Sequence, residues 1–560
     1  MKKTISCLLA FIMVLIAVAV PVGAAETEKH EKSPIIHISG SSIVICDAEG
    51  NPIPTGFDVL TQGNEESESV TNDDILDSAM NILKPFFLEG LPLDKWENYG
   101  NALYEELAPI WEETRLDGNG NAQYGTGVSA KEIAQWDKKA ATVDTGKDGK
   151  FDLYDYRFRY DWRLSPYDHV DRLHEYIKTV LKTTGCDQVC LLSRCIGGSM
   201  ITAYLEKYGS EGLVKKVMYD ETLSNGASAI NDAFSGQLAF SDKHIQSYLL
   251  ETEYFSNEGL GVDLAGIDEL LLELAKTGFD YMTQSGKLNI ALWSVEKLYE
   301  KLAEAFLPSM LLATGIGTWA NYWCSVYEED FDNALTFVFG EEGSARRAEY
   351  AGLIDKIIYI REHMITNKTD LYNTFADDYD VTVGIIASYG LVNPPIGIHH
   401  DETGDILVGI SDASFGATAA GLYDKLSEDY INERIAAGFG KYISPDGKID
   451  ASTCLFPETT WFIKNRHHDY EGAARYIGEY FTQYTNVTVD SNAKGISRFL
   501  VHDTEAVGQV VNMTEENCQD GPWITDVVQK PTINSVFNAF IQFIKTLFAY
   551  FKTLIGGMFA

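Results

Sequence analysis

The chain has 560 residues, more than one small core requires, so we expect one large domain with insertions or two domains. Apolar residues make up 45% of the sequence and aromatic residues 12%, a composition typical of a globular protein. The formal net charge of −38 repels polyphosphates and anionic lipid surfaces, which argues against a nucleic acid as partner.

The N-terminus has the layout of a secretory signal peptide. Met1–Lys3 is followed by an apolar stretch over Cys7–Val20 and by small residues that end at Ala25. The apolar stretch is too short to favour a lasting membrane span. We therefore expect residues 1–25 to be removed on export, so that the mature protein is secreted or associated with the cell surface.

The cysteines are few for so long a chain. Seven of the eight lie beyond the signal peptide, and an odd number leaves at least one thiol outside any intramolecular disulfide. No CxxC pair occurs, so the sequence indicates neither a disulfide scaffold nor a zinc ribbon. A free thiol with a function is compatible with this pattern.

The first half of the mature chain alternates predicted strands with predicted helices. Pro34–Ile38 is expected to be a buried strand, and Ser39–Ser42 follows it as a tight loop. Apolar residues recur at helical spacing from Asp74 to about Leu116. A second strand is predicted over Tyr156–Trp162, and a helix over Tyr167–Lys182.

A third predicted strand, Gln188–Leu192, leads into the turn Ser193-Arg194-Cys195-Ile196-Gly197 and then a helix that ends near Tyr208. A further strand is predicted over Val214–Tyr219. Strands that alternate with helices form a mainly parallel sheet with helices on both faces. The predicted fold class is therefore α/β.

Residues 225–378 contain long helical stretches and no strand pattern, which predicts a helical cap inserted over the sheet. Strand patterns return over Val381–Ser388 and Thr460–Lys464, and Ile406–Ile410 is a strand-like run. We therefore predict a signal peptide (1–25), the N-terminal part of the core (26–224), the cap (225–378), the C-terminal part of the core (379–530) and a C-terminal helix (531–560).

The C-terminal segment is predicted to be an amphipathic helix of about 20 residues. Apolar residues between Ile533 and Ile555 form one wide stripe, and Lys545 and Lys552 lie on the polar side. Two interpretations stay open. The helix either covers a groove on its own domain or attaches the protein to a membrane or the cell envelope.

Cys195 stands at the position of a nucleophile. A side chain at a sharp turn from strand to helix is presented to substrate, and the turn requires small neighbours such as Gly197 and Gly198. The helix N-terminus favours a negative charge, whether a thiolate or a tetrahedral oxyanion. The turn differs from the usual G-x-S-x-G pattern, because Ser193 replaces the first glycine and Cys195 replaces the serine.

Other residues make a family resemblance specific. Tyr160-Asp161-Trp162-Arg163 precedes a helix, with the cysteine turn about 30 residues later, and Pro34–Ser42 supplies an opening strand with a loop of small residues. These features resemble the lecithin:cholesterol acyltransferase branch of the α/β-hydrolases. The resemblance covers most of residues 34–480 and implies an α/β-hydrolase fold with acyl hydrolysis or acyl transfer as the activity.

The resemblance also implies the order nucleophile, acid, histidine along the chain. Pro445-Asp446-Gly447 resembles the family's turn that carries the acid, and His467 and His468 follow the predicted strand Thr460–Lys464. We prefer His468 to His467 because the more distant histidine can reach back along the loop. The implied triad is therefore Cys195, Asp446 and His468.

Each of these residues has an expected role. Cys195 would attack an acyl carbonyl, His468 would take the thiol proton, and Asp446 would hold the imidazole. The backbone N–H groups of Ser41 and Ile196 would form the oxyanion hole. The thioester intermediate would pass its acyl group to water, an alcohol, an amine or a thiol, and we expect neither a cofactor nor a metal.

Several alternatives weigh against these roles. Asp412, which follows the run Ile406–Ile410, is a second candidate acid, and the Asp446 segment also fits an ordinary Pro-Asp-Gly turn. The cluster His399-His400-Asp401 has metal-binding residue types, but we favour its interpretation as surface histidines in an acidic loop. Asp161 and Arg163 are expected to form a structural ion pair.

The sequence thus predicts an exported acyl hydrolase or acyltransferase that acts on ester-type, lipid-like substrates beneath an apolar helical cap. The alternative is a catalytically silent protein of the same fold, which binds a partner or the envelope through its C-terminal helix. In that case Cys195 is a small buried residue without chemistry. A thiol protease or amidase is a third hypothesis.

Overall fold

The computed structural model describes residues 33–38, 40, 45–47, 49–53, 81–82, 84–142, 156–239, 241–257, 295–395 and 397–526. The predicted signal peptide, the predicted C-terminal helix and Ser41 lie outside the described residues. No helix in the described ranges is long and apolar enough to cross a membrane. All seven cysteines beyond residue 25 are described, and no disulfide joins any two of them.

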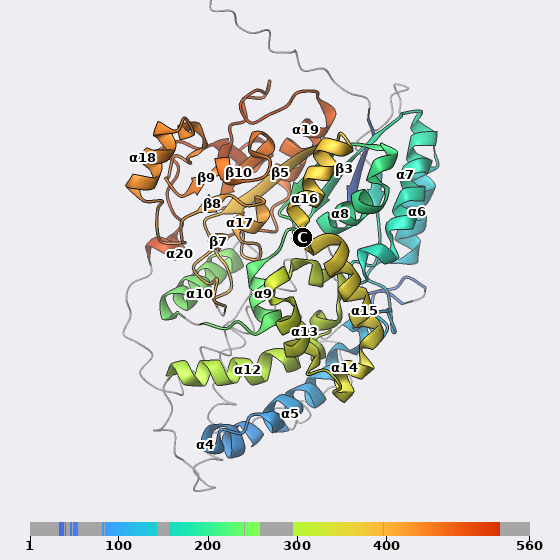
Figure 1. The fold of residues 1–560 in the computed structure, drawn as a ribbon, viewed down its shortest axis with the longest axis vertical. Helices are drawn as coiled ribbons and strands as arrows, with labels where there is room; N and C mark the ends of the chain where they lie inside the picture. Colours follow the sequence, from blue (N-terminus) through green and yellow to red (C-terminus); the bar gives the residue numbers. More distant parts are fainter. Residues whose placement is uncertain are drawn as a thin grey trace, which may run out of the picture.

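A sheet of eight strands forms the centre of the molecule (Figure 1). Seven strands run parallel, and only the edge strand β12 is antiparallel to its neighbour. The predicted α/β fold class is confirmed. The spatial order is β12 (Val510–Asn512), β11 (Phe499–His502), β10 (Thr460–Lys464), β5 (Thr382–Tyr389), β4 (Val214–Asp220), β3 (Val189–Arg194), β1 (Ile35–Ile38) and β2 (Tyr156–Phe158).

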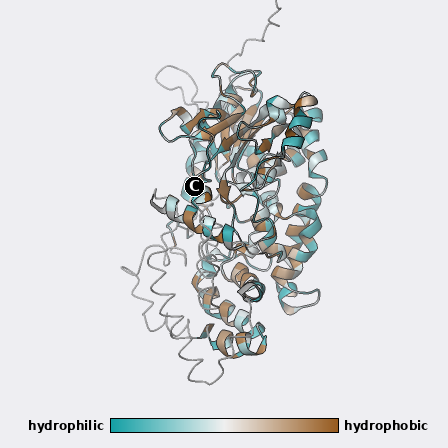
Figure 2. Ribbon diagram, turned by 90° about the vertical axis from the view of Figure 1, so that its left-hand side faces the viewer, coloured by the Kyte–Doolittle hydropathy of each residue, from teal (hydrophilic) through white to brown (hydrophobic). Residues whose placement is uncertain are grey.

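Helices cover both faces of this sheet, as predicted. On one face, α7 (Val170–Thr184) and α8 (Gly197–Tyr208) contribute to the larger apolar core. On the other face, the helical segment Ala474–Glu479 and α19 (Tyr480–Gln483) pack against a smaller cluster. Because both faces are covered, the inner strands are largely buried and rich in apolar residues, and Figure 2 shows their hydrophobic residues within the surrounding helices.

Helices and short turns form the described parts of residues 225–378, apart from an isolated bridge at Leu238. One N-terminal helix, α5 (Glu97–Leu107), joins this layer and packs closely on α12, since a Cβ on Gly100 would lie 3.0 Å from the Ala305 carbonyl oxygen. The helices of 225–378 are α9 (Ser228–Ser235), α10 (Asp242–Asn257), α12 (Val295–Ala313), α13 (Phe331–Phe339), α14 (Ala345–Glu349), α15 (Ala351–Ile360) and α16 (Lys368–Asn373).

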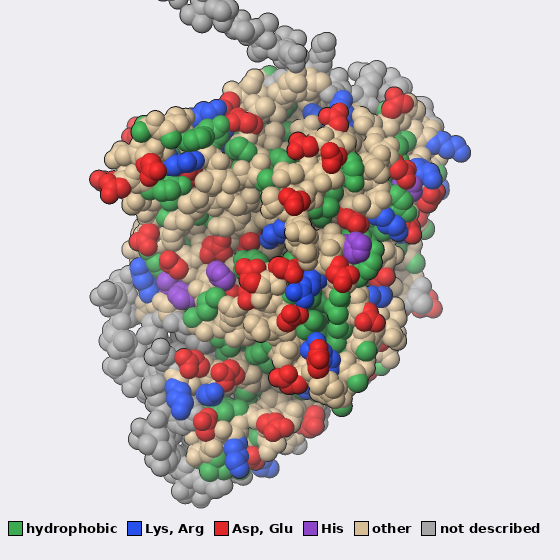
Figure 3. Space-filling view, in the orientation of Figure 1, with side chains coloured by type: hydrophobic (Ala, Val, Ile, Leu, Met, Phe, Trp, Pro, Cys, Tyr) green, Lys and Arg blue, Asp and Glu red, His purple; other side chains and the backbone are tan. Residues whose placement is uncertain are grey.

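Smaller elements complete the described chain. Two small antiparallel sheets pair β6 with β7 and β8 with β9, and Asp405 directly follows β7. Acidic side chains are spread over the face shown in Figure 3, in agreement with the net charge of −38. These elements are α4 (Leu91–Leu93), α6 (Ala130–Ala140), β6 (Leu391–Val392), β7 (Thr403–Gly404), α17 (Ile410–Ala413), β8 (Thr418–Ala419), α18 (Glu428–Ala436), β9 (Ile449–Asp450) and α20 (Pro522–Thr525).

Two sequence predictions of strands require correction. The strand predicted over Tyr156–Trp162 ends at Phe158, because Asp161 and Arg163 form a buried two-point ion pair that turns the chain. The run Ile406–Ile410 is no strand. There the Asp405 carboxylate accepts two backbone N–H groups, Ile406 has a φ of +90°, and α17 begins at Ile410.

Candidate active site

Cys195 lies at a strained turn between β3 and α8. Its φ of +52° is rare for a residue with a side chain, and the surrounding backbone holds it there. The Cys195 N–H donates to the Asp220 carbonyl at 3.0 Å, and its own carbonyl accepts from Gly198 at 3.1 Å. A Cβ on Gly198 would lie 1.8 Å from the Thr222 hydroxyl oxygen, so this turn requires glycine. The predicted strand, sharp turn and helix are all present.

His468 lies in the loop that follows β10, and its side chain is paired with Asp405. The imidazole Nδ1 lies 2.5 Å from Asp405 Oδ2, and neither residue has any exposed surface. The backbone N–H of His468 also donates to the carbonyl oxygen of Asp405, at 3.1 Å. Two contacts therefore fix the ring and assign Nδ1 to the carboxylate.

The Asp405 carboxylate is held ionised by its loop. Oδ1 accepts the backbone N–H groups of Leu407, at 2.9 Å, and Val408, at 2.7 Å. Burial by itself raises the pKa of Asp405, but the His468 charge and these hydrogen bonds lower it below its ordinary value. Asp405 therefore presents a negative charge to the imidazole at neutral pH.

The His468 side chain also lies beside Cys195. Nε2 is buried, and Cys195 is one of the two residues whose side chains hydrogen-bond to this imidazole and raise its pKa. Burial lowers the pKa of His468, yet the charges of Asp405 and then Cys195 raise it well above the ordinary value. Carboxylate, imidazole and thiol therefore form one buried row, in which the histidine favours its protonated form.

The structure does not bring Asp446 to this histidine. Its Oδ2 accepts from Lys464 Nζ at 2.9 Å and from the Tyr389 hydroxyl at 3.1 Å, while Oδ1 accepts from Ser444 at 2.6 Å. Lys464 lies at the end of β10 and is itself buried, so Asp446 neutralises a buried ammonium. The acid beside His468 is Asp405, which sequence reasoning missed because its loop has the composition of a strand.

The other candidate residues also have separate partners. Asp412 accepts from the Tyr327 hydroxyl at 2.8 Å and from the Ser228 backbone N–H at 3.0 Å. His467 is buried with its ring 4.6 Å from that of Phe255 on α10, and burial lowers its pKa to about 3. Of the two adjacent histidines, only His468 contacts Asp405.

The residues of the metal candidate are each engaged elsewhere. His399 pairs with Asp232 at 2.8 Å, and Asp401 pairs with His244 at 3.1 Å. The His400 ring contacts the carbonyl of Gly397. Within the described ranges, no group of three or more His, Cys, Asp or Glu side chains is arranged to hold a metal ion.

Gly40, in the loop after β1, lies directly beside the thiol. A Cβ on Gly40 would be 3.0 Å from the Cβ of Cys195 and 3.7 Å from its sulfur. Ser41, the predicted oxyanion donor, follows outside the described residues, and Ile196 is the N-cap of α8. The first N–H groups of a helix have no carbonyl partner within it, so Ile196 lies at a terminus suited to an oxyanion.

A second buried charge cluster lies behind the acid and went unnoticed in the sequence. Arg466 pairs with Asp220 at 2.7 Å and with Glu221 at 2.9 Å, and all three side chains are fully buried. Burial, and then the charge of Asp405, raise the pKa of Glu221 well above its ordinary value. The acidic pair at the end of β4 was the available sequence indication.

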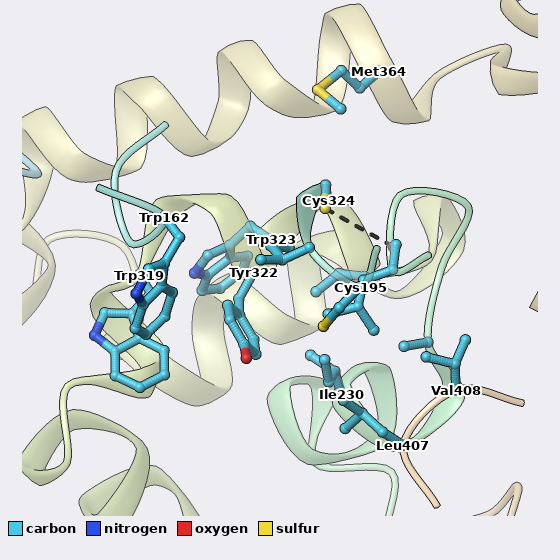
Figure 4. Close-up of a cluster of buried hydrophobic side chains, with 14 of the residues drawn as sticks. Trp162, Cys195, Ile230, Trp319, Tyr322, Trp323, Cys324, Met364, Leu407 and Val408 are labelled. Atoms are coloured by element: carbon cyan, nitrogen blue, oxygen red, sulfur yellow. Dashed lines mark hydrogen bonds between the residues drawn. The ribbon is translucent and has the colours of Figure 1, made fainter. Parts of the chain in front are cut away.

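The surroundings of the thiol are apolar (Figure 4). Cys195 is 3% exposed and belongs to one buried cluster with Ile230, Leu407, Val408 and Tyr322. Leu407 and Val408 are the residues whose backbone N–H groups hold Asp405. The loop that positions the acid therefore also lines the space around the nucleophile.

No family model matches the chain, and no curated protein matches it. Among solved structures, the crystal structure of the Tle4–Tli4 complex aligns with a TM-score of 0.27 and 9% sequence identity, over 91% of this chain and 98% of that chain. A likeness of this degree carries no argument about activity. A function for this chain therefore has to rest on the geometry of the site.

Proposed function

We infer that this chain is an acyl hydrolase or acyltransferase that uses Cys195 as nucleophile, His468 as base and Asp405 as the acid that orients it. The observation that carries the inference is the buried row of these three side chains, with the cysteine at a strained turn. A non-glycine residue at positive φ is costly and is typical of functional sites. In this proposal Asp405 takes the role that the resemblance implied for Asp446.

The geometry supports a two-step reaction. The Cys195 sulfur, having passed its proton to His468, adds to an acyl carbonyl carbon, and the carbonyl electron pair moves to oxygen. Collapse of this intermediate breaks the bond to the leaving group, which receives the proton from His468. Water or another acceptor then attacks the thioester, and His468 accepts the acceptor's proton, so the thiol is regenerated.

The environment favours an apolar acyl group. The thiol lies among aliphatic and aromatic side chains, and the protein carries a net charge of −38, which repels polyanionic substrates. The resemblance of residues 34–480 to the lecithin:cholesterol acyltransferase branch supports the same substrate class, a lipid-like ester. The signal peptide predicted over residues 1–25 supports export as part of this proposal.

A series of p-nitrophenyl esters with acyl chains of increasing length tests this function. We expect release of p-nitrophenol and a thioester on Cys195, detected by mass spectrometry of the intact chain. Cys195→Ala should abolish both, and His468→Ala should slow acylation. If the wild-type chain forms no adduct on Cys195 with any chain length, the proposed function is wrong.

One observation favours the silent alternative. Cys195 is only 3% exposed, so a substrate reaches it only if the surrounding residues move. If the protein is catalytically silent, Cys195→Ala should leave every activity and phenotype unchanged. The ester series therefore separates the two hypotheses directly.

A further inference from the structure

Tyr160 carries a buried hydroxyl that makes no hydrogen bond within the described part of the chain. The residue is 5% exposed and its Oη is enclosed. Most buried polar groups in native proteins are paired, because leaving one unpaired sacrifices its interaction with water. An unpaired buried hydroxyl is therefore expected where a ligand supplies the missing partner.

The segments that carry Tyr160 and Cys195 leave the sheet on either side of β1, at the same end. Ile38 of β1 pairs with Phe158 of β2 on one side and with Ser193 of β3 on the other. Two residues further along each segment stand Tyr160, Gly40 and Cys195. Tyr160 lies on the same side as Phe158, because the two rings are stacked with centroids 5.9 Å apart.

Gly40 follows β1, which lies in the sheet between the strands that lead to Tyr160 and to Cys195. A Cβ on Gly40 would come within 3.0 Å of the Cβ of Cys195, so the absence of a side chain leaves room beside the nucleophile. Burial, and then the charge of Cys195, raise the pKa of Tyr160 far above its ordinary value. The hydroxyl therefore lies within electrostatic reach of the thiol and keeps its proton.

We propose that the Tyr160 hydroxyl donates a hydrogen bond to the carbonyl oxygen of the acyl group that Cys195 attacks. This inference rests on the proposed function. As the C–S bond forms and the carbonyl electron pair moves to oxygen, the hydroxyl stabilises the oxyanion without giving up its proton. It releases that oxygen when the carbonyl is restored and the leaving group departs with the proton from His468.

The tyrosine is well placed for this role because the fold holds its ring. Besides the stack on Phe158, the ring packs edge-on against His169, with centroids 5.5 Å apart. His169 in turn contacts the carbonyl of Asp161, at 3.0 Å. Pre-positioned donors of this kind need no reorganisation during the reaction.

Tyr160→Phe provides the test, with Tyr176→Phe as matched control. Tyr176 lies on α7, and its hydroxyl donates to the Arg157 carbonyl at 2.9 Å. We expect Tyr160→Phe to slow acylation of Cys195 by the p-nitrophenyl ester about 100-fold, as loss of one oxyanion donor does. Its melting temperature should equal or exceed that of the wild type, because an unpaired polar atom is removed. Tyr176→Phe should show the reverse, with a lower melting temperature and unchanged acylation.

Alkylation by iodoacetamide completes the test, because that reaction forms no oxyanion. The rate of Cys195 alkylation should be the same in Tyr160→Phe and wild type. If Tyr160→Phe acylates as fast as the wild type, or if alkylation and acylation fall together, the role of Tyr160 is refuted and the proposed function stands. If the wild type is not acylated at all, both fail.

Discussion

Replacing Asp405 by asparagine separates the acid found in the structure from the acid implied by the sequence. Asparagine keeps the size of the side chain, and its carbonyl oxygen can still accept the backbone N–H groups of Leu407 and Val408. It removes the negative charge 2.5 Å from the Nδ1 of His468. The amide also favours the tautomer with the proton on Nε2, which cannot accept a proton from the thiol.

The expected loss is large. In the serine-protease template, aspartate to asparagine lowers kcat by about 10⁴-fold. A thiolate needs less help from a base, so we expect Asp405→Asn to lower kcat by about 10²- to 10³-fold, or about 3 to 4 kcal/mol of barrier. The assay is steady-state hydrolysis of a p-nitrophenyl ester, with rates divided by the folded fraction from circular dichroism.

Asp446→Asn is the matched control. It leaves the buried ammonium of Lys464 without one of its two carboxylates, the other being Asp520 at 2.7 Å. Breaking a buried ion pair lowers the free energy of unfolding by about 3 to 5 kcal/mol. Because Asp520 remains as a partner, we expect a loss of about 3 kcal/mol for this variant. Its kcat per folded molecule should not change. A large loss of kcat in Asp446→Asn, with activity retained in Asp405→Asn, would refute the assignment of the acid.

Three further substitutions have defined outcomes. Gly40→Ala places a Cβ 3.0 Å from that of Cys195. We expect this to displace Cys195 and to lower the rates of both acylation and alkylation by about 10- to 100-fold. Unchanged rates would show that the loop moves aside without displacing Cys195. Gly198→Ala places a Cβ 1.8 Å from the Thr222 hydroxyl oxygen, so chemical denaturation should show a loss of about 1 to 3 kcal/mol, and stability equal to the wild type would contradict the packing. Burial lowers the pKa of His467 to about 3. Between about pH 3 and pH 6.5, its imidazole is therefore neutral in the folded chain and protonated in the unfolded chain. The free energy of unfolding should therefore fall by about 1.4 kcal/mol per pH unit from about pH 6.5 toward pH 3, and urea titrations of His467→Gln should lack this contribution; an equal slope in both proteins would argue against the buried neutral histidine.

Much of the fold follows from local sequence patterns. The apolar run before Ser193, the small residues of the turn and the helical spacing after Gly198 require no knowledge of distant residues. Their strand and helix lie within a few residues of the predicted bounds. The short strands β11 and β12 lie at the edge of the sheet and have no strong pattern, and the sequence analysis did not predict them.

The acid could not be predicted for a physical reason. Ile406, Leu407 and Val408 have the composition of a strand, but the Asp405 carboxylate accepts the backbone N–H groups of Leu407 and Val408, and the Asp405 N–H donates to the Val408 carbonyl, so the chain turns there. A Pro-Asp-Gly turn, by contrast, is conspicuous in sequence whether or not it has a function, and Asp446 stands in one.

Contacts between residues far apart in the chain could not be predicted either. Arg466 meets Glu221 across 245 positions of the chain, and neither residue type predicts a buried position without its partner. The choice between His467 and His468 depends on how the loop after β10 turns, which no periodicity fixes.

Alkylation of Cys195 by iodoacetamide at neutral pH tests the central claim most directly. Burial lowers the pKa of His468, but the charges of Asp405 and then Cys195 raise it well above its ordinary value, so a positive charge lies beside the sulfur. A neighbouring imidazolium makes a thiol more reactive. We predict that the wild-type chain is alkylated at Cys195 at least about 10-fold faster than His468→Ala at this pH. Equal rates in the two proteins would contradict the proposed catalytic row of Cys195, His468 and Asp405.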